Sequence, residues 1–271
     1  MEKISIIIPV YNQARLLEKC VSSFCKQGDK NVEVIVVDDG SIDAIKEVIK
    51  KFKKEKRVRW FKQKNLGPSA ARNLAYRKMK GKALLFIDAD QEVPLNFITE
   101  VRRAFLYADA IYIPEKSASD NFWTKCIEYE RKILYDHTGR GVPRGYKKAL
   151  IGKIGFFDEK LKFGEDWELF QRAKKVHARF IQLNAVMIHH EVESPLHTIN
   201  KYVKYGRKSY LLLKKEKTAV TFYSAIDRKV VKNAVKYFFK NPLLFCGSAV
   251  YRAVKTVCAA VGYIKEKIKA I

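Results

Sequence analysis

The sequence predicts an α/β protein: a mostly parallel sheet flanked by helices, followed by a C-terminal α-helical extension. Two observations support this fold class. Short, almost uninterrupted apolar runs alternate with stretches of helical periodicity through the first 110 residues, and residues 201–271 show helical periodicity alone. Unbroken apolar strands are expected where helices cover both faces of a parallel sheet. We therefore expect an α/β domain at 1–200 and a basic amphipathic helical extension at 201–271.

The first half of the sheet is predicted in detail. The expected strands are Ile4–Val10, Val32–Asp38, Val58–Lys62 and Ala83–Asp88. The expected helices between them are Ala14–Gln27, Ile42–Lys56 and Pro68–Met79. Ser41 and Asp43 are expected to cap the second of these helices. Ligands of doubly wound sheets bind beyond the carboxyl ends of the strands, so the residues after each strand are the first candidates for a site.

The pattern after residue 110 is less regular. The predicted elements are a strand Ala110–Ile113, a helix Asn121–Tyr135, a glycine-rich loop Thr138–Tyr146, a helix from Glu165 to about Val176, and a strand Phe180–Ile188. His189 and His190 follow that strand. No internal repeat or low-complexity segment is visible.

Charge is the unusual feature of the composition. Lys and Arg number 54 and Asp and Glu 29, a formal net charge of +25, and 48% of the residues are hydrophobic, which excludes a disordered chain. Residues 201–271 hold 17 basic and 3 acidic residues, or +14. This excess predicts a polyanionic partner. Nucleic acid is disfavoured because no basic recognition helix or zinc motif is present, although a nucleic-acid-binding protein remains an alternative.

The cysteines and the apolar stretches near the two termini bear on the cellular location of the protein. The five cysteines are scattered, without a CxxC motif, which favours a reducing compartment over a disulfide framework. The N-terminal apolar run is too short for a signal peptide. Arg252 and Lys255 interrupt the apolar stretch Leu243–Ile264, and each would cost about 2.5–3.5 kcal/mol at the centre of a membrane-spanning helix. We therefore expect no transmembrane helix.

The strand ends carry residues suited to a nucleotide and a metal ion. Asp88-Ala89-Asp90 offers the oxygen ligands that Mg²⁺ or Mn²⁺ needs when it bridges carboxylates and phosphates. Asp38 and Asp39 can accept hydrogen bonds from a nucleobase, and Tyr11 can stack on its face. The alternatives are turn-forming aspartates and ordinary packing of the tyrosine.

Two further segments carry candidate chemistry. In Asn65–Asn73 a Gly-Pro turn precedes a helix that contains Arg72, and a helix N-terminus with a guanidinium suits a diphosphate. Glu165-Asp166 opens a later helix, where Asp166 can act as a general base and Trp167 can offer a face to a sugar or apolar acceptor. The helix dipole alone also favours acidic residues there.

A metal site made by the two aspartates would gain a third ligand from a histidine at the end of the last sheet strand. We favour His189 because it is the first residue after the predicted strand, and His190 remains the alternative.

Together these motifs resemble an inverting family 2 glycosyltransferase of the GT-A fold, over residues 3–207. The motifs are PVYN, VVDDGSID, NLGPSAARN, LLFIDAD, GFFDEKLKFGEDWELFQR and the terminal histidine. The resemblance implies a UDP- or GDP-linked sugar donor and a Mn²⁺ or Mg²⁺ cofactor. Position by position it implies nucleotide-binding residues Pro9, Tyr11, Asp38, Asp39, Arg72 and Asp88, metal ligands Asp88, Asp90 and His189, and catalytic residues Asp166 and Glu165.

Departures from related patterns refine the prediction. Processive synthases of this family carry Gln-x-x-Arg-Trp, whereas this chain has only Gln171-Arg172, so single addition is expected. Polyprenyl-phosphate sugar synthases resemble this chain in the Asp-Ala-Asp stretch, but their anionic acceptor needs no base, and Glu165-Asp166 favours a hydroxyl acceptor. The Lys- and Arg-rich surroundings leave a polyprenyl-phosphate sugar synthase as the alternative. A dinucleotide oxidoreductase is disfavoured because GxGxxG is absent.

The C-terminal helices are predicted to bind a membrane surface. Lys229, Lys232, Lys236 and Lys240 form a basic stripe, and apolar residues recur from Val250 to Ile271 at helical spacing. Such helices suit the anionic cytoplasmic face of the cell membrane, which predicts a cytoplasmic, peripheral enzyme with a lipid-linked or glycan acceptor. The alternative is packing on the catalytic domain or on a second copy of the chain.

Overall fold

A computed structural model describes residues 2–135, 141–161, 164–190, 194–215 and 228–269. The chain divides into two compact units. The sheet unit comprises residues 1–116, 139–160 and 165–190, and the helical unit comprises residues 117–138, 161–164 and 191–271.

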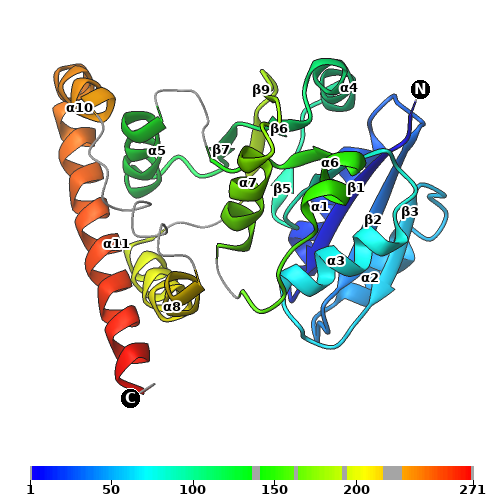
Figure 1. The fold of residues 1–271 in the computed structure, drawn as a ribbon, viewed down its shortest axis with the longest axis horizontal. Coiled ribbons are helices and arrows are strands. Elements are labelled where there is room, and N and C mark those ends of the chain that lie inside the picture. The colour runs from blue at the N-terminus through cyan, green and yellow to red at the C-terminus, as the bar shows by residue number, and fades with distance from the viewer. Residues whose placement is uncertain (1, 136–140, 162–163, 191–193, 216–227, 270–271) are drawn as a thin grey trace. The chain divides into compact units, whose positions relative to one another are not determined.

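A sheet forms the centre of the sheet unit (Figure 1). It has seven strands in the order β3-β2-β1-β4-β8-β6-β9. Its strands are β1 Ile4–Val10, β2 Val32–Asp38, β3 Val58–Lys62, β4 Ala83–Phe86, β6 Ala110–Tyr112, β8 Gly145–Lys147 and β9 Phe180–Gln182. All neighbouring strands run parallel except β8, which is antiparallel to β4 and β6. The predicted α/β class with a mostly parallel sheet is confirmed.

The strand β8 corrects one prediction. Part of the expected loop Thr138–Tyr146 is a strand, and residues 136–140 lie outside the described part of the chain. A Cβ atom on Gly145 would come within 2.5 Å of a side-chain atom of Ile111 and 2.6 Å of one of Leu85. This glycine therefore lets β8 pack closely between β4 and β6. The glycine pattern suggested a loop, but a glycine in a strand can also mark a close approach of the neighbouring strands.

Side chains of successive strand residues point to opposite faces, and each face has its own core. Ile6 and Val36 belong to a cluster that includes residues of α1 (Ala14–Cys25) and α4 (Phe97–Tyr107). Ile7 and Ile35 belong to a cluster that includes residues of α3 (Pro68–Lys78), α6 (Lys148–Ile154) and α7 (Glu165–Lys175). The period of two in a strand produces this division, so helices cover both faces.

The helix α2, Ile45–Lys51, is shorter than expected, and the predicted caps belong elsewhere. Its N-cap is Ala44, without a side-chain hydrogen bond. Asp43 Oδ2 instead accepts a hydrogen bond from the backbone N–H of Ala14, at 2.8 Å. Asp43 thus caps the first turn of α1, a contact between residues 29 positions apart that local sequence patterns do not reveal.

A second, three-stranded sheet has the order β5-β10-β7. Its strands are β5 Gln91–Glu92, β7 Glu115–Ser117 and β10 Met187–His189. The strand predicted over Phe180–Ile188 is therefore two strands in different sheets, and His189 ends the second of them. The pairing of His189 with Gln91 brings the end of β10 next to the Asp88–Asp90 turn.

The helical unit contains α5 Phe122–Tyr135, α8 Pro195–Lys215, α10 Arg228–Lys240 and α11 Pro242–Lys269. The predicted boundary at residue 200 lies within α8, and α5 belongs to the same compact unit as the C-terminal helices. Glycines permit close helix packing here. A Cβ atom on Gly206 would lie 2.0 Å from the carbonyl oxygen of Ala259, and one on Gly262 would lie 2.1 Å from that of Val203.

By length and composition α11 is apolar enough to cross a membrane. The sequence pattern had predicted no transmembrane helix. The two basic residues in the middle of α11 are paired within the helical unit. Lys255 Nζ lies 2.7 Å from Glu130 Oε1 of α5, and Arg252 Nη1 lies 3.3 Å from the same oxygen. Glu130 is buried and the side chain of Lys255 is 15% exposed, whereas that of Arg252 is 46% exposed. Lys255 therefore lies at the packed face of the helix, and Arg252 lies at the margin of that face.

Candidate active site

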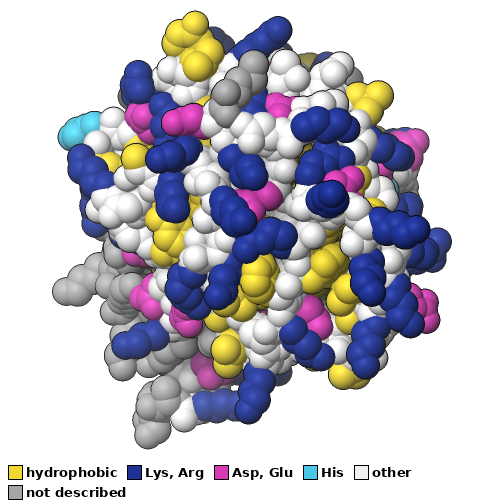
Figure 2. Space-filling view, turned by 90° about the vertical axis from the view of Figure 1, so that its right-hand side faces the viewer, with side chains coloured by type: hydrophobic (Ala, Val, Ile, Leu, Met, Phe, Trp, Pro, Cys, Tyr) yellow, Lys and Arg dark blue, Asp and Glu magenta, His cyan; other side chains and the backbone are white. Residues whose placement is uncertain are grey.

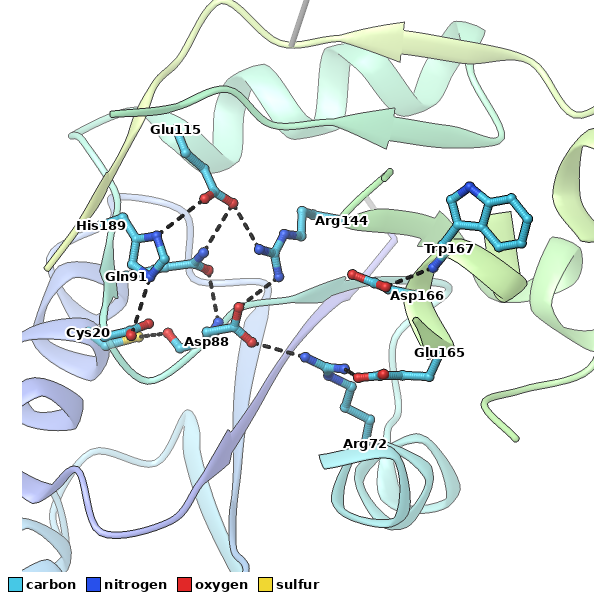
Figure 3. Close-up of polar contacts among 11 residues, drawn as sticks. Cys20, Arg72, Asp88, Gln91, Glu115, Arg144, Glu165, Asp166, Trp167 and His189 are labelled. Atoms are coloured by element: carbon cyan, nitrogen blue, oxygen red, sulfur yellow. Dashed lines mark hydrogen bonds and ion pairs between the residues drawn. The ribbon is translucent and has the colours of Figure 1, made fainter. Parts of the chain in front are cut away.

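Asp88 lies at the centre of a cluster of charged side chains in the sheet unit (Figure 3). It follows β4 at the carboxyl edge of the sheet, and its backbone N–H donates to Gln91 Oε1 at 2.9 Å. One carboxylate oxygen accepts from Arg72 Nη2 at 3.0 Å and the other from Arg144 Nη1 at 2.8 Å. Burial opposes its ionisation, but the two guanidinium groups outweigh burial and hold the pKa of Asp88 well below its usual range.

Each arginine also contacts a second carboxylate. Arg72 Nη1 donates to Glu165 Oε1 at 2.9 Å, and Arg144 Nη2 donates to Glu115 Oε1 at 2.9 Å. Burial would raise the pKa of Glu115, but Arg144 and His189 outweigh it and lower that pKa to about 2. The cluster therefore alternates acidic and basic groups, an arrangement that keeps buried charges ionised.

His189, rather than His190, lies beside the predicted metal ligands. Its Nε2 is 3.3 Å from Asp90 Oδ2 and its Nδ1 is 3.5 Å from Glu115 Oε2. Burial would lower the pKa of His189, but the two carboxylates outweigh it and raise that pKa to about 10. His190 instead pairs with Glu92, at 2.9 Å.

The donor set suits a hard divalent cation, although the ligands are not assembled around one point. Among the described residues no group of three or more His, Cys, Asp or Glu side chains is arranged to hold a metal ion. Both carboxylate oxygens of Asp88 accept hydrogen bonds from arginines, one from Arg72 and the other from Arg144. Asp90 Oδ1, however, is buried without a hydrogen-bond partner, a costly arrangement that a cation would relieve. Carboxylate oxygens and an imidazole are ligands that Mn²⁺ accepts.

The predicted catalytic pair begins α7. Asp166 Oδ1 accepts the backbone N–H of Trp167 at 2.8 Å. Glu165 is tied to Arg72, and burial, together with the nearby Asp166 charge, raises the pKa of Glu165 despite that arginine. Lys162 and Phe163, in the segment before this pair, lie outside the described residues.

The predicted base-binding residues follow β1 and β2. Pro9 pairs with Val37 in the parallel register, and Tyr11 is 47% exposed beyond the end of β1. Asp38 is buried; its Oδ1 accepts the backbone N–H of Ser41 at 2.8 Å.

Asp39 has a visible structural role. Its Oδ1 accepts hydrogen bonds from Gln63 Nε2 at 2.8 Å and from the Leu66 backbone N–H at 2.9 Å. Its Oδ2 accepts the backbone N–H of Gly67 at 2.9 Å. Asp39 therefore fixes the loop before α3, the helix that carries Arg72.

The predicted site did not include Arg144, Glu115 or Gln91. Arg144 lay in the expected loop, and Glu115 follows a strand without any motif around it. Gln91 Nε2 donates to Glu115 Oε1 at 3.1 Å, so it joins two segments that are 24 residues apart. The signal in the sequence was Gly145, next to Arg144, because a glycine can mark a place where two backbone segments lie close together.

Known proteins resemble this chain in sequence. The family model "Glycosyl transferase family 2" matches residues 5–155. An uncharacterized glycosyltransferase of Rickettsia felis is 40% identical over 121 residues, which cover 42% of this chain and 20% of that protein. The "GalNAc(5)-diNAcBac-PP-undecaprenol beta-1,3-glucosyltransferase" of Campylobacter jejuni is 27% identical over 183 residues, covering 66% of this chain and 55% of that protein.

Solved structures resemble it in fold. The mannosyltransferase PcManGT from Pyrobaculum calidifontis, in complex with GDP-Man and Mn²⁺, has a TM-score of 0.60 at 15% identity, covering 100% of this chain and 81% of that one. S. aureus TarS 1–349 in complex with UDP-GlcNAc has a TM-score of 0.57 at 18% identity, covering 98% of this chain and 92% of that one. The family model spans more than half of the sequence and the sheet has the matching architecture: the chain belongs to glycosyltransferase family 2.

Proposed function

We propose that this glycosyltransferase moves a sugar from a nucleoside-diphosphate sugar to a hydroxyl acceptor, with inversion and with the help of a divalent metal ion. The observation that carries the proposal is the cluster around Asp88. It joins the residue after β4, the arginine of α3 and the acidic start of α7 through contacts of 3.0 Å or less. A donor diphosphate, its metal ion and a catalytic base would meet at such a point.

The residues at the carboxyl edge of the sheet suit binding of the nucleotide-sugar donor. Tyr11 offers an exposed ring, and Asp38 a carboxylate, at the ends of the adjacent strands β1 and β2. Solved structures of similar fold contain UDP-GlcNAc or GDP-Man, which supports a nucleotide-sugar donor of either kind. Asp39 serves this site indirectly, because it holds the loop that leads to Arg72.

Asp88, Asp90 and His189 would hold the metal ion. When bound, Mn²⁺ or Mg²⁺ would supply positive charge to the donor diphosphate. The unpartnered Asp90 Oδ1 and the neighbouring imidazole support this assignment. The Mn²⁺ in the structure of PcManGT is consistent with it.

The chain's own residues account for the transfer. Asp166 accepts the proton of the acceptor hydroxyl while the hydroxyl oxygen bonds to C1 of the sugar from the side opposite the leaving group. The bond between C1 and the nucleoside diphosphate breaks at the same time, and Arg72 stabilises the negative charge that develops on the diphosphate. Glu165 holds Arg72 in place and is therefore a positioning residue.

We further propose that the acceptor is lipid-linked or a glycan at the cytoplasmic face of a membrane, and that the helical unit binds this surface. Several large apolar side chains of α10 and α11 are exposed: Val235, Phe238, Phe239, Leu243, Val250, Val257, Val261, Ile264 and Ile268. Because Arg252, in the middle of α11, is 46% exposed and charged, this helix suits a position along the surface rather than across the bilayer. The name of the Campylobacter relative describes an undecaprenol-linked substrate, which supports a lipid-linked acceptor.

A donor panel tests the enzymatic proposal. Purified protein is incubated with UDP-glucose, UDP-GlcNAc and GDP-mannose, each with Mn²⁺, with Mg²⁺ and with excess EDTA, and binding and nucleoside diphosphate release are measured. We expect one nucleotide class to bind and to release its diphosphate only with metal. Full release in EDTA would contradict the metal assignment, and no binding of any donor would contradict the proposal.

A further inference from the structure

Arg144 has a place in the site that its sequence context does not suggest. It directly precedes β8, and its backbone is fixed on both sides: its carbonyl oxygen accepts the Phe86 N–H at 2.7 Å, and its N–H donates to the Ile111 carbonyl oxygen at 2.9 Å. The side chain of Arg144 therefore starts beside Phe86, the last residue of β4, and Phe86 precedes Asp88 by two positions in the sequence. Only 18% of it is exposed.

Arg144 and Arg72 are arranged around Asp88 in the same way. Each guanidinium gives one nitrogen to a peripheral glutamate, Glu115 for Arg144 and Glu165 for Arg72, at 2.9 Å in both cases. Each gives another nitrogen to a different oxygen of the Asp88 carboxylate, at 2.8 and 3.0 Å. The glutamates anchor the two arginines independently of Asp88 (Figure 3).

This arrangement has a consequence for an anion that enters the site. If the Asp88 side chain turns away, two N–H groups remain oriented toward the same point by Glu115 and Glu165. Guanidinium groups bind phosphate oxygens with strong, directional hydrogen bonds. The Asp88 carboxylate thus occupies the position that suits a phosphate.

We propose that Arg144 is a ligand of the β-phosphate of the donor, and that it exchanges its contact with Asp88 for a contact with this phosphate when the donor binds. The exchange frees a carboxylate oxygen of Asp88 at the same moment. Glu115 is the positioning residue that keeps Arg144 in place during the exchange. This inference rests on the proposed nucleoside-diphosphate-sugar donor.

The test compares nucleotides that differ by one phosphate. The affinities of UDP and UMP, or of GDP and GMP if the donor panel selects guanine, are measured by calorimetry with Mn²⁺ for the full chain and for Arg144→Gln. We expect the substitution to weaken diphosphate binding by about tenfold or more. Monophosphate binding should change by less than about twofold, since Arg144 contacts only the second phosphate.

Further variants separate binding from structure. Arg144→Lys keeps the positive charge but lacks the forked guanidinium group. The ratio of diphosphate to monophosphate affinity should therefore fall less in Arg144→Lys than in Arg144→Gln. Arg144→Lys also replaces Arg144→Gln in the test if the latter does not fold. Glu115→Gln removes the anchor and should also lower the ratio. Arg179→Gln is the matched control, because Arg179 is another ion-paired arginine of the sheet unit, bound to Asp109, and should leave both affinities unchanged.

An unchanged affinity ratio in a folded Arg144 variant would overturn the inference, whether both affinities stay the same or both fall equally. Failure of the unsubstituted protein to bind any nucleoside diphosphate would instead refute the proposed donor, and the inference with it.

Discussion

In the proposed mechanism, different residues of the site balance charge and accept the proton. Asp88 is ionised because two arginines contact it, and those arginines are oriented because Glu115 and Glu165 contact them. Among the described residues, no ion pair joins Asp166 to this cluster; its Oδ1 accepts the backbone N–H of the adjacent Trp167. Glu165 and Asp166 are neighbours in the sequence, but we propose different roles for them.

The substitution Asp166→Asn should therefore remove chemistry and leave binding intact. An amide cannot accept the acceptor proton, so turnover should fall by about 10²–10⁴-fold. Donor affinity should stay near that of the unsubstituted protein because the Asp88 cluster is retained. Steady-state kinetics and donor calorimetry measure the two effects. Asp109→Asn, which alters a carboxylate paired with Arg179, is the control, and unchanged turnover in Asp166→Asn would refute the base assignment.

Metal binding should depend on pH through His189. The pKa of this residue is raised to about 10 without a metal, so the imidazole is protonated at neutral pH and must lose its proton to become a ligand. The apparent affinity for Mn²⁺ should accordingly rise as the pH increases from 6 to 9, up to about tenfold per pH unit. Calorimetry in buffers of different ionisation enthalpy would detect the released proton.

The variant His189→Gln provides the comparison for this prediction. It should bind Mn²⁺ more weakly and with a flatter pH dependence, because one titrating ligand is gone. An equal slope in both proteins would show that His189 does not exchange its proton for the metal.

Elements are held together by contacts that link distant segments. Arg57, just before β3, is such a link: it donates to Glu55 at 2.9 and 3.0 Å and to the carbonyl oxygen of Cys25, the last residue of α1, at 2.7 Å. The hydrogen bonds from Arg57 lower the pKa of Glu55 from 4.5 to about 2. The ionised Glu55 is thus favoured in the folded state.

The stability effect of Glu55 should therefore depend on pH. Because its folded-state pKa is depressed, its contribution is complete above about pH 4.5 and is lost as the pH falls toward 2. The difference in unfolding free energy between the unsubstituted protein and Glu55→Gln should shrink between pH 6 and pH 3 in urea titrations. Glu18→Gln alters an exposed pair with Lys51 and should have little effect at any pH. A constant difference for Glu55→Gln would contradict this account.

Packing of α8 against α11 should fail when a glycine at their contact acquires a side chain. In Gly262→Val the new Cβ would meet backbone atoms, which cannot rotate away, so the helical unit should lose about 1–3 kcal/mol or more of unfolding free energy. Gly152→Ala in α6, where no atom lies within 4 Å of the added Cβ, should be neutral or slightly stabilising. Hydrogen exchange of α8 and α11 amides would locate the effect, and unaltered protection in Gly262→Val would disprove it.

At the scale of the whole molecule the charge has two parts. On the face drawn in Figure 2, Lys and Arg side chains are spread widely among fewer acidic ones. The denser excess, 17 basic against 3 acidic residues, belongs to residues 201–271, where apolar side chains of α10 and α11 are exposed. Of the predicted basic stripe, the side chain of Lys229 lies outside the described residues, as does Ile271 of the apolar series. Basic charge beside exposed apolar groups matches an anionic lipid surface.

Binding to vesicles should therefore require the exposed apolar residues of the helical unit. The full chain should sediment with vesicles that contain phosphatidylglycerol, and less so at high salt. Phe239→Asp and Leu243→Asp, at positions 79% and 68% exposed, should weaken binding by about tenfold or more. Leu106→Asp, at a position of α4 that is 70% exposed, is the matched control and should bind normally. Equal binding by all variants would exclude this surface.

The sequence by itself determined the alternation of strands and helices from Ile4 to Phe86, the cover of helices on both faces of the sheet and the placement of the Asp38 and Asp88 motifs at strand ends. These features depend on local periodicity and on the fact that parallel strands share a carboxyl edge. Val32–Asp38 and Val58–Lys62 were predicted to the residue for this reason. Only the tertiary structure decided which charges meet. Arg144 reaches Asp88 across 56 positions, Asp43 caps a helix that precedes it, and His189 rather than His190 faces Asp90. Such pairings depend on the relative placement of distant strands, which local periodicity does not encode.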